Sequence, residues 1–324
     1  MELFGGAGHS LEIAKKISCN GRLIGIDRDE EAINAAKEKL KDFQNVTYVH
    51  DNHDNIKNIL KNLEIEKVDG ILLDLGVSSY QLDERERGFS YMQEADLDMR
   101  MDKSQTLTAK EVVNSYEEAT IAKILYEYGE EKFSRTIAKN IVKAREIKPI
   151  ETTKELVEII EKSIPKKYQV KEGHPAKRTF QAIRIEVNDE IKPLENTIKE
   201  CIECLAPGGR LCTITFHSLE DRAVKNAYIE ASGKCTCPPD LPYCVCGNPS
   251  LGRIITRKPI IPKEEEQEEN SRSKSAKLRI FEKRWTKENG STWTKLQQIS
   301  VWNKPKKTTT KRRTKKKTSK AKKG

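Results

Sequence analysis

The sequence of 324 residues contains no uninterrupted run of eighteen apolar residues, and its N-terminus has no charged stretch followed by an apolar one. A membrane-spanning helix needs about 20 largely apolar residues, and a secretory signal needs the second pattern. Neither is therefore expected, and we predict a cytoplasmic protein. Eight cysteines are too few for a disulfide scaffold in a chain of this length. The sequence also lacks an internal repeat, so its length indicates one large globular domain or two smaller ones.

The positive charge of the sequence is concentrated at its C-terminal end. The formal net charge is +10, but the stretch 303–324 alone holds twelve lysine or arginine residues and no acid. The residues before it are therefore slightly acidic in sum. We expect 286–324 to be a disordered basic tail with too few apolar residues to fold. Such a tail accelerates encounters with a polyanion through counterion release, or keeps the chain soluble, or serves as a nuclear or nucleolar address in a host with a nucleus.

Strand and helix patterns alternate from about residue 4 to residue 75, as they do in a parallel sheet. Apolar runs predict strands at 22–27, 46–49 and 68–74, with helical periodicity between them. A turn at Ala206-Pro207-Gly208-Gly209 then leads into a further predicted strand at 210–216. The pattern predicts an α/β fold with a doubly wound, Rossmann-like sheet.

Strand patterns are absent from about residue 104 to residue 177, where apolar residues recur at helical spacing. Ser115-x-x-Glu118 and Thr152-x-x-Glu155 have the pattern of capping boxes, which begin helices. This stretch predicts an all-helical domain inserted into the sheet domain. We expect a long helix from about Arg178 towards Leu205, and a loop over the polar stretch 263–275.

A glycine-rich segment near the start is typical of a cofactor loop. Gly5, Gly6 and Gly8 directly precede a predicted helix, and Asp27 follows nineteen residues after Gly8 at the end of a strand. Amides at a helix N-terminus bind either the pyrophosphate of a dinucleotide or the carboxylate of S-adenosylmethionine. An acid after the second strand accepts ribose hydroxyls in both cases. The glycines alone leave both cofactors open, and a plain tight turn is the third interpretation.

Asp74 ends an otherwise apolar strand, at the edge where open α/β sheets bind ligands. A carboxylate at this place can accept a hydrogen bond from an exocyclic amine and direct its nitrogen towards a cofactor methyl group, which is catalysis mainly by positioning. In the alternative interpretation, Asp74 caps the turn that follows the strand.

Four of the cysteines are close together in the sequence. Cys235-x-Cys237 and Cys244-x-Cys246 offer four thiolates for a tetrahedral zinc ion of the structural type. One-residue gaps between ligands are less common for zinc than two-residue gaps. Structural zinc and unmetallated thiols are therefore equal alternatives for this segment.

Several motifs spread over most of the chain resemble those of one enzyme family. They are Gly5–Ser10, Ile26–Asp29, Leu72–Ser79, Glu86–Ser90, Leu97–Asp102, Tyr128–Glu131, His174–Ala182 and Phe216–Arg222. In this order they resemble the RsmH (MraW) family, from Gly5 to about Arg284. The resemblance implies a class I methyltransferase fold that uses S-adenosylmethionine to methylate N4 of a cytidine in the decoding centre of 16S ribosomal RNA. It implies that RNA, or the small ribosomal subunit, as the partner.

The motifs and the helical stretch together define an expected domain organisation. We assign 1–102 and 178–285 to the two halves of the methyltransferase domain, 103–177 to the helical insert for substrate recognition, and 286–324 to the basic tail.

The family's functional residues can be carried over motif by motif. Its cofactor contacts fall on Ala7, Gly8, His9, Asp27, His53, Asp74 and Gln81, and Asp74 is also the candidate catalytic acceptor of the amine hydrogen bond. The resemblance says less about the target pocket. Because of the polar density of the motifs in which they lie, Asp98, Arg100, His174, Arg178 and His217 are candidates for lining the base pocket or binding phosphates. A structural ion pair or a buried histidine is the alternative for each of them.

Two positions depart from the family pattern. Members of the family usually have an aromatic residue where His53 stands, and a neutral imidazole offers adenine a smaller stacking surface. The sequence also begins with only Met1-Glu2-Leu3 where the family has most of a first strand and an acid near its end; Met1 stands at the position of that acid. Either the start is misassigned or truncated, or the first strand is absent and cofactor binding is weakened.

Two other functions fit parts of the pattern. A nicotinamide-dependent oxidoreductase would use the glycine loop and Asp27 but not the remaining motifs. A catalytically impaired RNA-binding or ribosome assembly factor on a methyltransferase fold would fit the short start and the basic tail. The sequence leaves the oligomeric state open, with a dimer among the alternatives.

Overall fold

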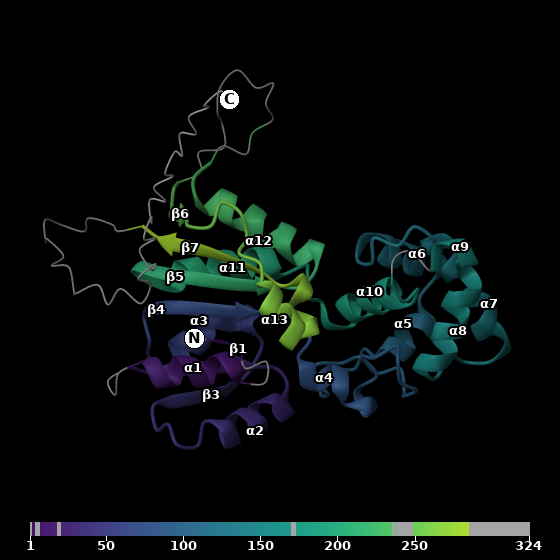
Figure 1. Cartoon of the computed structure of the whole chain (residues 1–324), viewed down its shortest axis with the longest axis horizontal. Helices are drawn as coiled ribbons and strands as arrows, with labels where there is room; N and C mark the ends of the chain where they lie inside the picture. Colours follow the sequence, from purple (N-terminus) through teal and green to yellow (C-terminus); the bar gives the residue numbers. More distant parts are fainter. Residues whose placement is uncertain are drawn as a thin grey trace, which may run out of the picture. The chain divides into compact units, whose positions relative to one another are not determined.

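The computed structural model describes residues 2–3, 7–17, 21–169, 173–234, 237 and 249–284. Within them, the strands form one sheet in the order β3-β2-β1-β4-β5-β7-β6 (Figure 1). Strands β1 to β5 pair in parallel, and β7 is antiparallel to both of its neighbours. The strands are β1 (Glu2–Leu3), β2 (Leu23–Asp27), β3 (Val46–His50), β4 (Val68–Asp74), β5 (Leu205–Thr215), β6 (Gly252–Ile254) and β7 (Lys277–Lys283). The predicted α/β class is confirmed.

The first strand is present, although it is only two residues long. In β1, Glu2 pairs with Gly25 of β2 and with Leu72 of β4, so this strand occupies the centre of the sheet. Of the two alternatives that the sequence left open, the one in which the first strand is absent is therefore wrong. The glycines at 5 and 6 lie outside the described residues.

Helices cover both faces of the sheet, as the side chains of β2 show. Leu23 packs with helices α1 (Gly8–Lys16) and α2 (Glu30–Lys39). Ile24 and Ile26 belong to a second apolar cluster on the other face, because side chains alternate along a strand. The helices of that second cluster are α3 (Ile56–Asn62), α11 (Leu194–Cys204) and α12 (Ser218–Ala231). This two-sided cover is what a doubly wound sheet requires.

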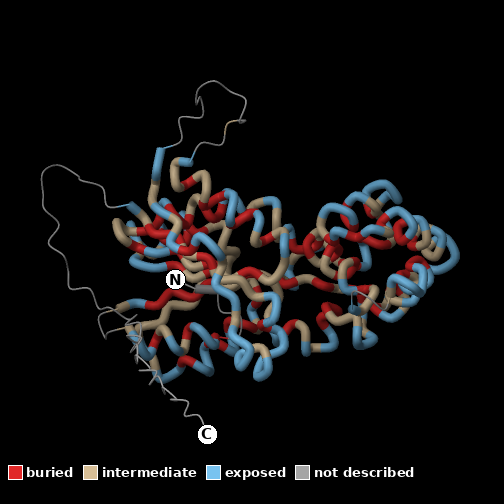
Figure 2. The backbone as a smooth tube through the Cα atoms, turned by 45° about the horizontal axis from the view of Figure 1, so that its top comes forward, coloured by how far each residue is buried: buried red, intermediate tan, exposed pale blue. Residues whose placement is uncertain are grey.

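A third apolar cluster belongs to the helices between β4 and β5. Figure 2 shows buried positions within these helices as well as along the strands. The cluster also includes Phe89 and Met99, which precede the helices, and Phe180 and Ile183 of α10. The packing therefore groups α10 with the helical core, although the domain division from sequence begins the second methyltransferase half at 178. The helices that contribute residues to it are α5 (Ala109–Ser115), α6 (Glu118–Glu127), α7 (Ser134–Ile147), α8 (Thr153–Ser163) and α10 (Lys177–Asn188). The short helix α9 (Lys166–Gln169) has no buried residue.

The long helix expected from Arg178 towards Leu205 is wrong, because the chain forms two helices there. Helix α10 ends at Asn188, and Asp189 takes a left-handed conformation with φ of 47°. Helix α11 begins at Leu194, directly after Pro193. A left-handed residue followed by a proline stops one helix and starts the next. The loop between them carries Glu190 to the candidate site.

The two expected capping boxes have different outcomes. Thr152 and Glu155 form the reciprocal hydrogen bonds at the start of α8, as predicted. Ser115 does not cap α6, because it is the last residue of α5 and the N-cap of α6 is Glu117. A further capping box joins Thr108 and Glu111 at the start of α5.

The stretch 263–275, expected to be a loop, contains regular structure. It forms helix α13 (Glu264–Glu269) and a 3-10 helix, η3 (Ser271–Ser275). Shorter elements elsewhere are α4 (Ser79–Asp83), η1 (His53–Asn55) and η2 (Arg85–Arg87). In the part of the chain that the structure describes, none of the helices is long and apolar enough to cross a membrane. The basic tail lies outside the described residues.

Candidate active site

A large cavity opens at the carboxyl ends of the parallel strands. The strand order reverses between β1 and β4, and doubly wound sheets bind ligands beside such a reversal. The cavity has a volume of about 1220 Å³, and its lining includes Gly8 after β1, Asp27 at the end of β2 and Asp74 at the end of β4. Helix α10, the start of α12 and the segment 260–278 supply further parts of its wall. Residues predicted at separate strand ends therefore meet in one site.

The start of α1 forms one end of the cavity. Ala7 is fully buried and takes a left-handed conformation with φ of 54°, which turns the chain from β1 into the helix. No atom lies within 4 Å of the position that a Cβ on Gly8 would occupy, so the backbone faces open space. The first amides of a helix lack partners within the helix and attract anionic groups. This helix start suits a carboxylate.

Asp27 is held by the turn that follows β2. Its Oδ1 accepts a hydrogen bond from the backbone N–H of Asp29 at 2.9 Å. Asp29 is itself buried, and its Oδ2 accepts from Arg87 at 2.8 Å and from Nε2 of Gln81 at 2.7 Å. The buried pair of Arg87 and Asp29 thus fixes the turn on which Asp27 lies.

Gln81 lines the cavity, but its polar atoms are committed to the fold. Its Oε1 accepts from the N–H of Ser78, which completes the capping box of α4, and its Nε2 donates to Asp29. Through these bonds Gln81 joins the start of α4 to the turn after β2, and its contact with a cofactor stays a prediction. The sequence motif had placed it among the cofactor contacts.

His53 lies in η1 with its imidazole mostly buried against the cavity. Burial lowers the pKa of His53 to about 4, although the neighbouring Asp54 carboxylate, 3.5 Å from Nε2, opposes this effect. The ring is therefore neutral at pH 7. A neutral ring can stack on a flat heteroaromatic ligand, as expected for this position.

Asp74 has a buried carboxylate oxygen without a partner. Its Oδ1 makes no hydrogen bond to any described residue, and Oδ2 lies 3.9 Å from Nε2 of His9. Burial raises the pKa of Asp74; His9 acts against this shift, and the charge of Glu220 adds to it. The structural alternative, in which Asp74 caps the following turn, has no support, because Oδ1 is unused and the N-cap of α4 is Ser78.

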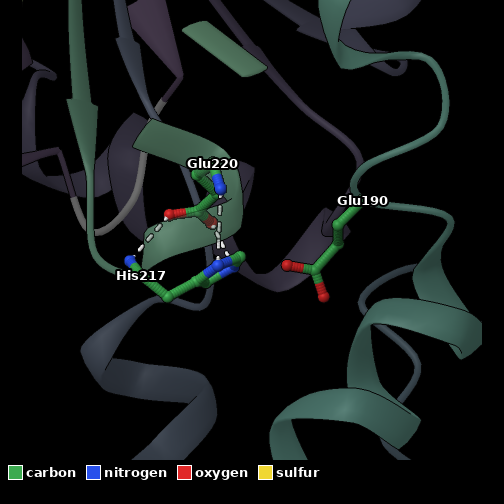
Figure 3. A group of neighbouring side chains, drawn as sticks. All are labelled: Glu190, His217 and Glu220. Atoms are coloured by element: carbon green, nitrogen blue, oxygen red, sulfur yellow. Dashed lines mark hydrogen bonds and ion pairs between the residues drawn. The ribbon is translucent and has the colours of Figure 1, made fainter. Parts of the chain in front are cut away.

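Glu190, His217 and Glu220 also line the cavity, and Figure 3 shows these three side chains close to one another. Glu220 is buried, and its Oε2 accepts from the backbone N–H groups of Phe216 and His217. Burial alone would raise the pKa of Glu220, but the adjacent imidazole of His217, whose Nε2 lies 3.0 Å from Oε1, and the charge of Arg184 lower it. The carboxylate of Glu190 points towards the His217 ring from the loop after α10 (Figure 3).

These three side chains have the spacing of a metal site but not the chemistry of one. Their ligand atoms lie within 4.8 Å of one another. However, Nδ1 of His217 accepts a hydrogen bond from the N–H of Glu220, which leaves the proton of a neutral ring on Nε2. Glu190 is also held by Arg184 through two hydrogen bonds of 2.9 and 2.8 Å. We assign no metal here.

The tentative substrate residues are not all brought together. His217 lines the cavity, whereas Asp98, Arg100, His174 and Arg178 do not. Asp98 and Arg100 bind each other at 2.8 Å, and Arg100 also donates to backbone carbonyls of the following loop. These contacts favour the structural interpretation of that pair.

The other two tentative residues lie around α10. His174 stacks on Tyr91 with ring centroids 4.6 Å apart and accepts from the N–H of Ala176, so it shapes the start of the helix. Arg178 donates to the carbonyl of Glu130 at 3.2 Å. These contacts join α10 to neighbouring segments of the chain.

Helix α10 is also joined to the sheet at its C-terminal end. Arg28, which follows Asp27, donates to the carbonyl of Asn188 at 2.9 Å, and Asn188 in turn bonds the backbone of Met99 and Met101. The sequence did not indicate this link, because its partners are far apart in the chain, and it did not single out Arg184, Glu190 or Glu220, whose place in the cavity depends on the tertiary fold. Three of the four zinc candidates, Cys235, Cys244 and Cys246, lie outside the described residues, so structural zinc stays a prediction.

Comparison with known proteins gives similarity over most of the chain. The profile of the MraW methylase family matches residues 2–284. The "Ribosomal RNA small subunit methyltransferase H" of Clostridium botulinum is 62% identical over 279 residues, which are 86% of this chain and 90% of that protein. The "Ribosomal RNA small subunit methyltransferase H 2" of Agathobacter rectalis is 58% identical over 281 residues, with 86% and 90% covered. The "Ribosomal RNA small subunit methyltransferase H" of Lachnospira eligens is 58% identical over 280 residues, which are 86% of this chain and 89% of that protein.

Proposed function

Because the chain belongs to the MraW methylase family, we propose that it transfers a methyl group from S-adenosylmethionine to N4 of a cytidine in the decoding centre of 16S ribosomal RNA. Relatives named for methyl transfer to ribosomal RNA of the small subunit support the substrate class. Those names do not specify which atom of the RNA is methylated. One observation carries it: Oδ1 of Asp74 is a buried acceptor without a partner at the carboxyl end of β4.

The described residues fit S-adenosylmethionine. The open backbone at Gly8, at the start of α1, suits the methionine carboxylate, and the neutral ring of His53 suits the adenine. Asp27, fixed by its own turn, suits the ribose hydroxyls. The carboxylate of Asp74 gives the cationic sulfonium a neighbour of opposite charge. Bound cofactor supplies an electrophilic methyl group on that sulfonium.

The chemistry of cytosine explains why a carboxylate is needed. The lone pair of the exocyclic amine is conjugated with the ring, so the amine is a weak nucleophile that must be held in position. Asp74 accepts a hydrogen bond from N4 and thereby directs the nitrogen. As the carbon–nitrogen bond forms and the carbon–sulfur bond breaks, the amine becomes acidic, and Asp74 accepts the proton that it releases.

The part of the cavity wall that α10 supplies is proposed to hold the target base. A base must leave its stack to reach such a cavity, and it is then held by stacking and by hydrogen bonds to its edge. Lys177, Phe180 and Gln181 of α10 line the cavity and provide charge, apolar surface and an amide at this wall. We propose that the helical core, which includes α10, forms the RNA-binding side of the site.

Two measurements on the full-length chain test this function. Calorimetry should show binding of S-adenosylmethionine and no binding of nicotinamide dinucleotides. Incubation with small ribosomal subunits and cofactor carrying a labelled methyl group should then transfer label to 16S ribosomal RNA. Cofactor binding without transfer would instead favour the ribosome assembly factor that the sequence left as an alternative.

A further inference from the structure

The imidazole of His217 has one nitrogen that the fold uses and one that it does not. Nδ1 accepts a hydrogen bond of 3.4 Å from the N–H of Glu220 and so caps the start of α12. A neutral imidazole carries one ring proton, so an accepting Nδ1 leaves that proton on Nε2. His217 is therefore a hydrogen-bond donor at Nε2, and its tautomer is fixed by the helix cap.

This donor is buried and has no hydrogen-bond partner among the described residues. Only 9% of the side chain is exposed, and although Oε1 of Glu220 lies 3.0 Å from Nε2, the two groups are not aligned for a hydrogen bond. A buried donor without a partner is costly, and a ligand that brings an acceptor removes the cost. The residue lines the cavity, where a ligand can supply that acceptor.

The second unpartnered group of the cavity follows the adjacent strand. Asp74 pairs with Ile214 in the register of β4 and β5, and the N–H of Leu75 donates to the carbonyl of Ile214 at 3.0 Å. His217 comes three residues after Ile214. The unused acceptor of Asp74 and the unused donor of His217 thus lie at the ends of neighbouring parallel strands and line one cavity.

We infer that the Nε2–H group of His217 donates a hydrogen bond to N3 of the target base, so that Asp74 and His217 together recognise the amidine edge of cytosine. This inference rests on the proposed function and adds the residue that selects the base. On the base edge, N3 is the neighbour of the amine, and in the protein His217 follows β5, the strand next to the one that ends at Asp74. The acceptor oxygen of Asp74 faces the N4–H donor of the base, and the Nε2–H donor of His217 faces the acceptor N3.

The pairing distinguishes cytosine from uracil. At neutral pH, N3 of cytosine is an acceptor, whereas N3 of uracil carries a proton. A uracil in the cavity would place its N3–H against Nε2–H and its O4 against the carboxylate of Asp74, so both contacts would be repulsive. Selection therefore comes from mismatched hydrogen bonds as well as from the missing amine.

Two variants of His217 separate the donor from the helix cap. In His217→Asn, the amide oxygen replaces Nδ1 and retains the cap, because Asn is a preferred N-cap residue, but the donor at Nε2 is lost. In His217→Gln, the longer side chain carries its N–H group to the place of Nε2, but the cap is lost. Thermal unfolding of both variants records the effect on the fold.

The substrates are small subunits reconstituted with 16S ribosomal RNA that carries cytidine or 3-deazacytidine at the target position. With cytidine, we expect His217→Asn to lower kcat/KM by about 10-fold to 100-fold and His217→Gln to stay within about 5-fold of the wild type. Replacing N3 by a carbon should cost the wild type a similar factor and should cost His217→Asn nothing further.

Two results would overturn the inference while leaving the proposed function intact. One is an equal loss from 3-deazacytidine in the wild type and in His217→Asn. The other is wild-type turnover in His217→Asn together with a loss in His217→Gln, which would make the helix cap the whole role of this residue. Absence of N4 methylation by the wild type on cytidine would remove the proposed function, and the inference with it.

Discussion

Nε2 of His9 lies 3.9 Å from Oδ2 of Asp74, so side chains that follow β1 and β4 meet at the reversal of the strand order. His9 comes from the start of α1, the candidate site for the methionine carboxylate, and Asp74 is the candidate acceptor for the target amine. This contact connects the helix start proposed to bind the cofactor with the carboxylate proposed to accept the proton of the target amine during methyl transfer.

Replacement of Asp74 by asparagine is expected to impair transfer much more than binding. The side chain keeps its size but loses the charge that accepts the amine proton, so kcat should fall by about 100-fold to 1000-fold. Affinity for S-adenosylmethionine, measured by calorimetry, should fall by less than about 10-fold, because one hydrogen bond is affected.

Asp69 provides a matched control on the same strand. It lies in β4 but is exposed and does not line the cavity. Asp69→Asn should leave both kcat and cofactor affinity unchanged. Turnover by Asp74→Asn within about 3-fold of the wild type would remove Asp74 from the mechanism.

The dependence of kcat on pH should have an acid limb that reflects Asp74. Burial raises the pKa of this carboxyl above its ordinary value of 3.8, and the ionised form is the one that accepts a proton. Activity is therefore expected to fall as the pH decreases through the raised pKa. His9 opposes the shift, so His9→Gln should move the limb to higher pH. A limb that keeps its position in His9→Gln would contradict this assignment.

His53 is expected to make the fold less stable in mild acid. The pKa of His53 is about 4 in the folded protein, whereas its ordinary value, taken for the unfolded chain, is 6.5. At a pH between these two values, His53 binds a proton in the unfolded chain but not in the folded protein. The free energy of unfolding should therefore decrease as the pH falls from 7 to 5, by about 2 kcal/mol from this residue.

Urea unfolding at pH 7 and pH 5 checks the effect of His53. His53→Phe should lose this part of the pH dependence, whereas His50→Phe, at an exposed position of β3, should retain the behaviour of the wild type. The phenyl ring should also bind adenine at least as well as the imidazole, because its apolar surface is larger. An unchanged pH dependence in His53→Phe would refute the assignment.

Removal of Arg87 should destabilise the fold through the charge that it leaves behind. Arg87 and Asp29 are 2% and 3% exposed and pair at 2.8 Å. Arg87→Ala buries the carboxylate of Asp29 without its partner, which typically costs about 3–5 kcal/mol. Arg85→Ala, in the same 3-10 helix but exposed, should cost about 0.5 kcal/mol or less. Equal losses in urea unfolding would contradict this role of Arg87.

Much of the sheet could be predicted from the sequence, because strand burial depends on local apolar patterns. The expected strands at 46–49 and 68–74 correspond to β3 and β4, and the polar residues Asp27 and Asp74 lie at the strand ends as expected. The carboxyl ends of parallel strands lie at the same edge of the sheet, and this is sufficient to bring the two carboxylates into one cavity.

The remaining features depend on contacts between distant segments. The helix break at Asp189 is stabilised where Arg28 meets the carbonyl of Asn188, 160 residues away in sequence. Glu190, which follows that break, lines the cavity together with Arg184 of α10. Gln81 has two structural partners, one of them 52 residues away, which no local pattern indicates. The donor at Nε2 of His217 required the geometry of the helix cap.

Identification of the methylated atom decides whether this chain is a cytidine N4 methyltransferase. Small ribosomal subunits are incubated with the full-length chain and S-adenosylmethionine that carries a trideuterated methyl group, and the nucleosides of 16S ribosomal RNA are then analysed by mass spectrometry. We predict N4-trideuteromethylcytidine from one nucleotide of the decoding centre, and none with Asp74→Asn. Label on O2′ or on another base, or cofactor binding with no label in the RNA, would contradict the proposed function.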